Sequence, residues 1–256
     1  MPATPAWPPS SLPRLYIDQA LAADTLLTLD GPAANYLGNV LRLQPGAEVK
    51  LFDDRTGEWL AQIKAAGRKR VSLEIRRRLR EREPAPDLWL LFAPIKRGRI
   101  DWLVEKATEL GAARLLPVLT QRTIVDRLNL DRLRAHAVEA AEQCDRTALP
   151  ELAEPVRLDA LLRSWSAGRS LLFADEEGGV PLAEAAGPAP AAILIGPEGG
   201  FTAAERDAIR SLEAARPVSL GPRILRAETA AVAAIALWMS AAGDWSRPPR
   251  SAPPEQ

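Results

Sequence analysis

Two glycine-containing stretches near the C-terminus decide the expected fold: Leu194-Ile-Gly-Pro-Glu-Gly-Gly-Phe-Thr-Ala-Ala-Glu205 and Leu220-Gly-Pro-Arg-Ile-Leu-Arg-Ala-Glu-Thr229. Each follows a short apolar run that is typical of a buried strand, and each leads into a helical pattern. We expect the two loops to lie side by side at the carboxyl edge of a parallel sheet, where open α/β sheets bind ligands. Neither loop matches G-x-G-x-x-G or a glycine loop followed by G-K-[ST], so the sequence disfavours a dinucleotide site or a P-loop.

The first loop has the features of a ligand-binding turn. Pro197 ends the preceding strand, while Gly199 and Gly200 permit positive φ angles and a close approach of the backbone to a ligand. Thr202-Ala-Ala-Glu205 is a capping box, which indicates the start of a helix. A plain strand-to-helix turn explains the capping box, but it explains less well why Glu198 stands between a proline and two glycines. We therefore interpret the loop as ligand-binding.

The second loop places a cation at the same edge of the sheet. Gly221-Pro222 ends the strand, and Arg226 precedes Glu228 and Thr229, which open a predicted helix from Ala230 to Ala242. Arg226 is therefore expected beside the ligand crevice. An ion pair with Glu198 or Glu228 is the alternative to a role in the chemistry.

The predicted last helix is apolar on several faces. Its apolar residues are spread too widely for one buried stripe; they include Val232, Ile235, Ala236, Leu237, Trp238 and Met239. A second copy of the chain, related by a two-fold axis, would cover the additional faces. We therefore predict a homodimer, and the alternative is that helices of the same chain cover this helix.

The rest of the chain divides into a β-rich part and an alternating part. Proline-rich flexible tails are expected at residues 1–13 and 247–256. Between them, residues 14–83 are predicted to form a small barrel-like domain, with a short helix at 33–41 and strands at 48–53, 59–63 and 71–75. A proline-containing linker is expected at Glu83–Asp87, and the domain expected at residues 84–246 then alternates strands with helices. The strands are expected at 88–93, 114–119, 170–174, 191–195 and 217–220, and helices at 99–110 and 130–144 among others. This alternation predicts a mostly parallel sheet with helices on both faces.

Composition limits the possible classes of protein. The chain has 256 residues, of which 47% are apolar, and its formal net charge is zero. The stretch from Lys64 to Arg82 is nevertheless strongly basic, which suggests a polyanion such as nucleic acid, with a solvated surface as the alternative. A single cysteine, Cys144, excludes an intrachain disulfide and a cysteine-based zinc site, and fits a reducing cytoplasm. No apolar run reaches 18 residues, so no membrane span is expected.

The paired loops resemble the C-terminal motifs of the ribosomal RNA small subunit methyltransferase E family, which belongs to the SPOUT superfamily of S-adenosylmethionine-dependent RNA methyltransferases. Other stretches are also similar to the family pattern: Leu37–Arg42, Lys96–Gly98, Val104–Gly111, Thr120–Thr123 and Glu139–Arg146. The resemblance spans roughly residues 14–243. Asn39 stands where arginine is more usual in the family.

The resemblance implies an α/β fold in which a C-terminal SPOUT-type domain, residues 84–246, follows a PUA-like RNA-binding β-barrel domain, residues 14–83. The two loops would form a trefoil knot in the parallel sheet and hold S-adenosylmethionine in a bent shape. The protein would be a cytoplasmic homodimer with its cofactor site near the dimer interface. Its substrate would be 16S ribosomal RNA or the small ribosomal subunit, methylated at N3 of a uridine.

Backbone groups and small or apolar side chains suffice to hold the adenine and methionine parts of such a cofactor. The expected cofactor-binding residues are Ile195, Gly196, Gly200, Leu220, Gly221, Ile224, Leu225 and Thr229. No metal is expected, because a sulfonium is already an activated methyl donor. The expected catalytic residues are Arg226, which would stabilise negative charge on the uracil oxygens, and Glu198, which would either orient Arg226 or help to move the N3 proton.

Arginines are the expected contacts to RNA phosphates. The candidates are Arg42, Arg76, Arg77, Arg78, Arg97, Arg122 and Arg146, each with ordinary surface charge as the alternative. Two other functions stay open at this point. One is a SPOUT enzyme that acts on another RNA, such as tRNA, or on a ribose 2′-oxygen, and the other is an RNA-binding protein without catalysis.

Overall fold

The computed structural model of the chain describes residues 12–67, 69–96, 98–125 and 127–247. The chain forms two compact units. The first extends to Pro84 and also includes Glu142–Ala148, and the second contains Ala85–Ala141 and the residues from Leu149 onward. Nearly all of the tails predicted at the two ends, and Arg97, lie outside the described residues.

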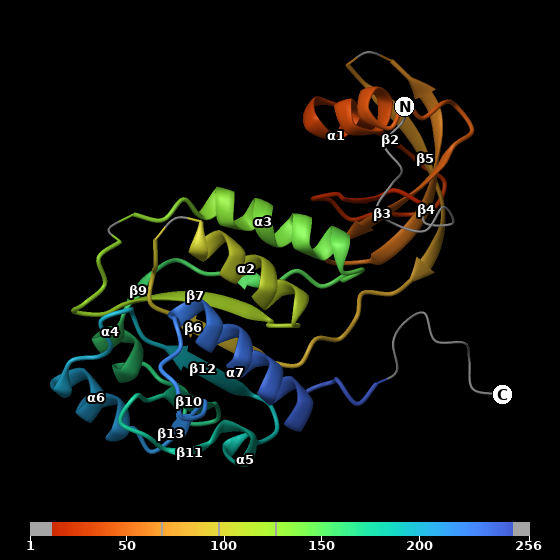
Figure 1. Cartoon of the computed structure of the whole chain (residues 1–256). Coiled ribbons are helices and arrows are strands. Elements are labelled where there is room, and N and C mark those ends of the chain that lie inside the picture. Colours follow the sequence, from red (N-terminus) through yellow and green to blue (C-terminus); the bar gives the residue numbers. More distant parts are fainter. Residues whose placement is uncertain (1–11, 68, 97, 126, 248–256) are drawn as a thin grey trace. The chain divides into compact units, whose positions relative to one another are not determined.

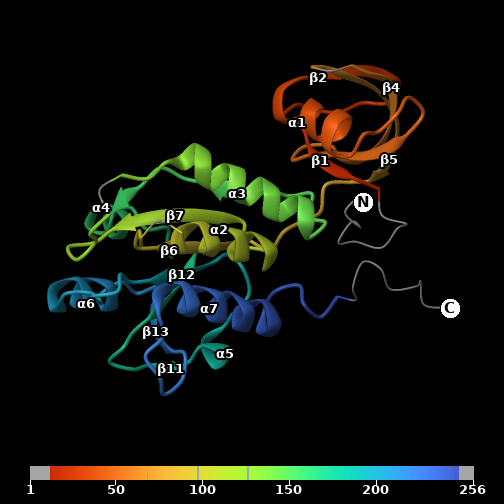
Figure 2. The same cartoon turned by 45° about the horizontal axis from the view of Figure 1, so that its top comes forward.

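The first unit is a curled five-stranded sheet with one short helical segment (Figures 1 and 2). The strands follow the order β1-β3-β4-β5-β2 and are antiparallel except for the parallel pair β1 and β3. Their bounds are β1 Arg14–Tyr16, β2 Thr25–Leu29, β3 Glu48–Asp53, β4 Gly57–Ala66 and β5 Val71–Arg80. The helical segment consists of α1, Gly31–Asn35, and a π-helical turn, η1, Tyr36–Val40. The three strands and the helix expected from the sequence are confirmed, whereas β1 and β2 were not individually predicted.

Alternation along β5 explains how this unit makes its core. Val71, Leu73 and Ile75 are buried, and the residues between them face outward, as a strand with one buried face requires. A buried ion cluster lies in the same unit: Glu58 accepts hydrogen bonds from Arg14 Nε at 2.6 Å and Arg80 Nε at 3.0 Å. Burial alone would raise the pKa of Glu58, but the hydrogen bonds from Arg80 and Arg14 outweigh it and lower that pKa.

The second unit contains an eight-stranded parallel sheet with the order β11-β13-β10-β12-β6-β7-β8, and β9 also pairs with β7. The strands are β6 Leu88–Phe92, β7 Arg114–Leu119, β8 Glu151–Leu152, β9 Val156–Arg157, β10 Ser170–Ala174, β11 Val180–Pro181, β12 Ala191–Ile195 and β13 Ala215–Ser219. The helices are α2 Arg99–Glu109, α3 Leu130–Gln143, α4 Leu158–Arg163, α5 Leu182–Ala185, α6 Ala203–Arg210 and α7 Ala227–Ala241. The five expected strands are confirmed, and β8, β9 and β11 are short additions that the sequence pattern did not reveal.

Helices cover both faces of this sheet, as expected from the sequence. Successive residues of a strand point to opposite faces, so Leu90 packs in the cluster with α2, α3, α5 and α7, and Leu91 packs in the cluster with α4 and α6. Both faces are therefore buried. This explains why the central strands read as continuous apolar runs rather than as alternating ones.

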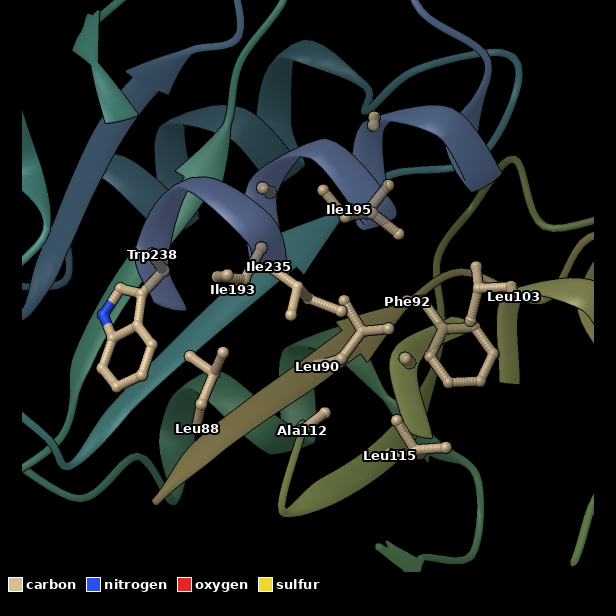
Figure 3. Packing of buried hydrophobic residues seen from close by; sticks show 14 of the residues in the cluster. Leu88, Leu90, Phe92, Leu103, Ala112, Leu115, Ile193, Ile195, Ile235 and Trp238 are labelled. Carbon is tan, nitrogen blue, oxygen red and sulfur yellow. The ribbon is translucent and has the colours of Figure 1, made fainter. Parts of the chain in front are cut away.

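Helix α7 is covered by its own chain more fully than the sequence analysis assumed (Figure 3). Ile235, Trp238 and Met239 are completely buried and pack in one cluster with Leu88 and Ile193 of the sheet. The prediction that Trp238 and Met239 belong to a surface covered by a partner copy is therefore wrong, because their own chain buries both. Of the six apolar residues named above for this helix, only Leu237 is exposed, at 38%, so a partner copy would have to cover the helix at Leu237.

Candidate functional site

Three loops enclose a cleft of about 620 Å³ at the carboxyl edge of the parallel sheet. They follow β10, β12 and β13. Because β10 lies between β12 and β13, the two loops expected to be side by side are separated by a third, Asp175–Gly178. Sequence reasoning missed this third loop, whose one signal was its position directly after a predicted strand. The volume is within the range of small-molecule sites, about 300–1,000 Å³.

Most of the cofactor-binding residues expected from the sequence line this cleft together. They are Ile195, Gly196, Gly200, Leu220, Gly221, Ile224 and Leu225, and both expected catalytic residues, Glu198 and Arg226, line it too. Thr229 does not line the cleft, because the last helix begins at Ala227 and carries Thr229 as an exposed residue in its first turn. The start expected at Ala230 was three residues late.

Two glycines are required by the shape of the loop after β12. Gly200 has a φ of +67°, and a Cβ at this position would lie 2.6 Å from Oε1 of Glu176. At Gly196, a Cβ would lie 2.8 Å from the ring of Phe201, which is buried below the loop. Glycine at these two positions therefore lets the loop pack closely against Phe201 and Glu176, which both line the cleft.

The same loop is anchored from the segment that follows β7. The capping box at the start of α6 is present as predicted: Thr202 accepts from the Glu205 backbone, and Glu205 Oε2 accepts from the Thr202 backbone at 2.9 Å. The other oxygen of Glu205 accepts from the backbone of Gln121 at 2.7 Å. Arg122 donates to the carbonyl of Gly199 at 2.6 Å. Arg122, expected to contact RNA, therefore supports the loop.

An acidic loop after β10 forms the third wall. Asp175 is buried and pairs with Arg206 at 3.2 Å and with Arg210 at 2.5 Å. The hydrogen bond to Asp175 is the main cause that raises the pKa of Arg210 above its ordinary value. Glu176 also pairs with Arg206, at 2.9 Å. These pairs fix the acidic loop to α6, so the cleft has a prearranged wall on this side.

Glu198 is paired with a residue that the sequence analysis did not single out. Its carboxylate accepts a hydrogen bond from Arg99 Nη1, and Arg99 Nε lies 3.6 Å from Glu228 Oε1. Arg226 has no side-chain hydrogen bond or ion pair to any other residue that the structure describes. The alternative in which Arg226 is paired with Glu198 or Glu228 is therefore wrong, because Arg99 takes both carboxylates.

The expected RNA-binding arginines divide into accessible and inaccessible ones. Arg42, Arg76, Arg77 and Arg78 are exposed, Arg42 with a φ of +54° and the other three in sequence on β5. Arg146 does not fit the role, because its side chain is only 6% exposed and lies 3.8 Å from Glu83. Sequence reasoning could not detect this, since the residue follows a helix and looks like a surface cation.

Comparisons with known proteins agree with this architecture. A family model described as an RNA methyltransferase domain matches residues 81–239, and one described as an RNA methyltransferase PUA domain matches residues 29–76. The ribosomal RNA small subunit methyltransferase E of Rickettsia conorii is 31% identical over 229 residues, which cover 87% of this chain and 93% of that protein. These matches define the class as two-domain RNA methyltransferases.

Solved structures support the same assignment. The ribosomal RNA small subunit methyltransferase E of Neisseria gonorrhoeae, bound to S-adenosyl methionine, is 28% identical, with a TM-score of 0.82 over 91% of this chain and 99% of that chain. A structure from Legionella pneumophila in complex with the bound cofactor SAM is 31% identical, with a TM-score of 0.81 and the same coverage. The chain belongs to the ribosomal RNA small subunit methyltransferase E family. In the part of the chain that the structure describes, no helix has the length and apolar character needed to cross a membrane.

Proposed function

We propose that this protein transfers a methyl group from S-adenosylmethionine to N3 of a specific uridine in 16S ribosomal RNA. The observation that carries the proposal is the three-loop cleft, whose lining includes loop glycines, apolar side chains and Arg226, a cation without a side-chain partner among the described residues. The chain shares its family with proteins named for methylation of small-subunit ribosomal RNA. Two similar structures hold the same cofactor.

The cleft suits this cofactor by size and by chemistry. Its lining combines the apolar side chains of Ile195, Leu220 and Leu225 with loop backbone at Gly196 and Gly200, which is the kind of surface that holds an adenine and a methionine chain. The absence of a Cβ at Gly200 lets the Glu176 side chain, which also lines the cleft, pack against the loop. When bound, the cofactor would supply an electrophilic methyl group on a sulfonium.

The residues of the chain would then align the two reactants and stabilise the charge that develops during the reaction. Alignment of the two reactants alone can supply on the order of 7–11 kcal/mol of the barrier. As the N3 proton leaves, negative charge would develop on the uracil oxygens, and the guanidinium of Arg226 would stabilise it. That charge would be discharged when N3 takes the methyl group and the bond between that methyl carbon and the sulfonium sulfur breaks, which leaves a neutral thioether. The carboxylate of Glu198 is held by its hydrogen bond from Arg99. Glu198 would therefore help to move the N3 proton of the uracil from a fixed position. The base must be unpaired, because N3 lies on its Watson–Crick edge.

The first unit would hold the RNA. Arg76, Arg77 and Arg78 expose three consecutive guanidinium groups on β5, and Arg42 is exposed beyond η1. Exposed cations of this kind contact phosphates without reading sequence. We further propose residues 14–83 and 84–246 as the functional domains, a trefoil knot in the second, and a cytoplasmic homodimer. The exposed face of α7 at Leu237 supports the dimer.

Nucleoside mass spectrometry of 16S ribosomal RNA from a deletion strain tests the proposal. We expect the loss of one 3-methyluridine and its return when the wild-type protein is supplied. The loss of a ribose-methylated nucleoside, or of a modification in tRNA, would instead support the related enzyme class. Unchanged modification in the deletion strain, together with a purified protein that binds RNA but not the cofactor, would support the non-catalytic alternative.

A further inference from the structure

Glu228 is a buried carboxylate next to the cleft for which the mechanism above has no use. Its side chain is 11% exposed, and Oε1 lies 3.6 Å from Arg99 Nε. The second oxygen, Oε2, is buried and accepts no hydrogen bond from the residues that the structure describes. A charged group held in this way is expensive unless a cation compensates it. Arg99 is the cation in contact with it.

Arg99 occupies a position that is unfavourable for a cation. It is the first residue of α2, directly after Gly98, whose φ is +89°. The N-terminus of a helix carries partial positive charge, so a guanidinium there is repelled unless nearby carboxylates outweigh the repulsion. Two carboxylates do so, Glu198 from the loop after β12 and Glu228 from the first turn of α7. Glu228 is itself favoured at a helix N-terminus.

Arg99 therefore connects a buried carboxylate to a cleft carboxylate. The two carboxylates differ in exposure, since the side chain of Glu198 is 36% exposed and that of Glu228 only 11%. The buried end is fixed by its helix, and the exposed end lines the cleft. Because Arg99 takes Glu198, Arg226 stays unpaired among the described residues that line the same cleft.

We propose that Glu228 is a positioning residue: it anchors Arg99, and Arg99 holds Glu198 in place and away from Arg226. This inference rests on the proposed function for its effect on turnover, but the positions of the side chains can be tested without it. Removing the charge of Glu228 should release Arg99. Glu198 is then free to pair with Arg226, which neutralises the cation that the reaction needs.

The test uses Glu228→Gln, which keeps the shape of the side chain. Proton–nitrogen NMR of the arginine Nε–H groups reports on Arg99 directly, and Arg99→Lys identifies its signal. We expect a signal protected from solvent exchange in the wild-type protein and loss of that protection in Glu228→Gln. Turnover should fall by roughly tenfold or more, as expected when one member of a largely buried ion pair is neutralised. The cofactor Kd should stay within about twofold, since Glu228 does not line the cleft.

Glu228 could also act only as a favourable charge at the start of α7. A double variant distinguishes this purely structural role from positioning through Arg99. If Glu228 acts through Arg99, Glu228→Gln causes no further loss of turnover in an Arg99→Gln background. Glu184→Gln is the matched control, because Glu184 is also in the first turn of a helix, α5, but does not line the cleft. It should leave turnover unchanged.

A protected Arg99 signal in Glu228→Gln, or additive losses in the double variant, would overturn the inference. If the wild-type protein methylates no RNA, the proposed function fails, and the NMR comparison alone decides the positioning role. Should Glu228→Gln not fold, Glu228→Asp shortens the same side chain and is read by the same signal.

Discussion

Adding a single methyl group at Gly200 tests the cleft most sharply. In Gly200→Ala the new Cβ would lie 2.6 Å from Glu176 Oε1, and the backbone φ of +67° would be strained for any residue with a side chain. Strain of this kind costs roughly 1–3 kcal/mol. The loop of the free protein can relax and relieve this strain, whereas the loop must keep the strained conformation when the cofactor is bound. The cost should therefore appear in the cofactor affinity, as a loss of about 5- to 150-fold.

Isothermal titration calorimetry with S-adenosylmethionine measures this loss. Gly46→Ala is a matched control, because Gly46 has a φ of +93° with open space around its Cβ and lies in the other unit. It should lower the thermal stability without changing the cofactor Kd. Gly200→Val should weaken binding at least as much as Gly200→Ala. A folded Gly200→Ala protein with wild-type affinity would refute the assignment of this loop to the cofactor.

Three further predictions concern the RNA surface, the dimer and the stability. Neutralising Arg76, Arg77 and Arg78 together should weaken RNA binding. The slope of log K against log salt should fall by roughly 0.7–0.9 for each phosphate that these arginines neutralise in the wild-type complex. An unchanged slope in filter binding would mean that the three arginines form only a solvated surface. Leu237→Glu should convert a dimer to a monomer in light scattering, and a wild-type monomer that methylates RNA would contradict the dimer. Glu58→Gln should lower the free energy of unfolding at pH 7 by roughly 3 kcal/mol. Because folding lowers the pKa of Glu58, that difference should shrink as the pH falls below about 4.3 in urea titrations, and a pH-independent difference would exclude the ion cluster as its source.

The sequence predicted those features that depend on local pattern. The five long strands of the second unit are continuous apolar runs because both faces of the sheet are buried, and the capping box at Thr202 marked the start of α6. The positive φ of Gly200 was also predictable, since glycine is the residue that tolerates it. The family resemblance rested on these same loops.

Features that depend on long-range pairing were not predictable in the same way. No local pattern places β10 between β12 and β13, so the acidic wall at Asp175 was missed. Arg99 is separated from Glu198 by 99 positions, and nothing in either segment indicates the pair. Trp238 was assigned to a partner surface because its helix is apolar all round, yet the sheet of the same chain buries it completely.

The most direct test of the central claim is methyl transfer in vitro. Purified protein is incubated with S-adenosylmethionine labelled in its methyl group and with small ribosomal subunits from a strain that lacks the protein, and the 16S RNA nucleosides are analysed by mass spectrometry. The account predicts one labelled 3-methyluridine per 16S RNA, greatly reduced with Arg226→Ala. Label on a ribose or on another base, or equal labelling with Arg226→Ala, would contradict it.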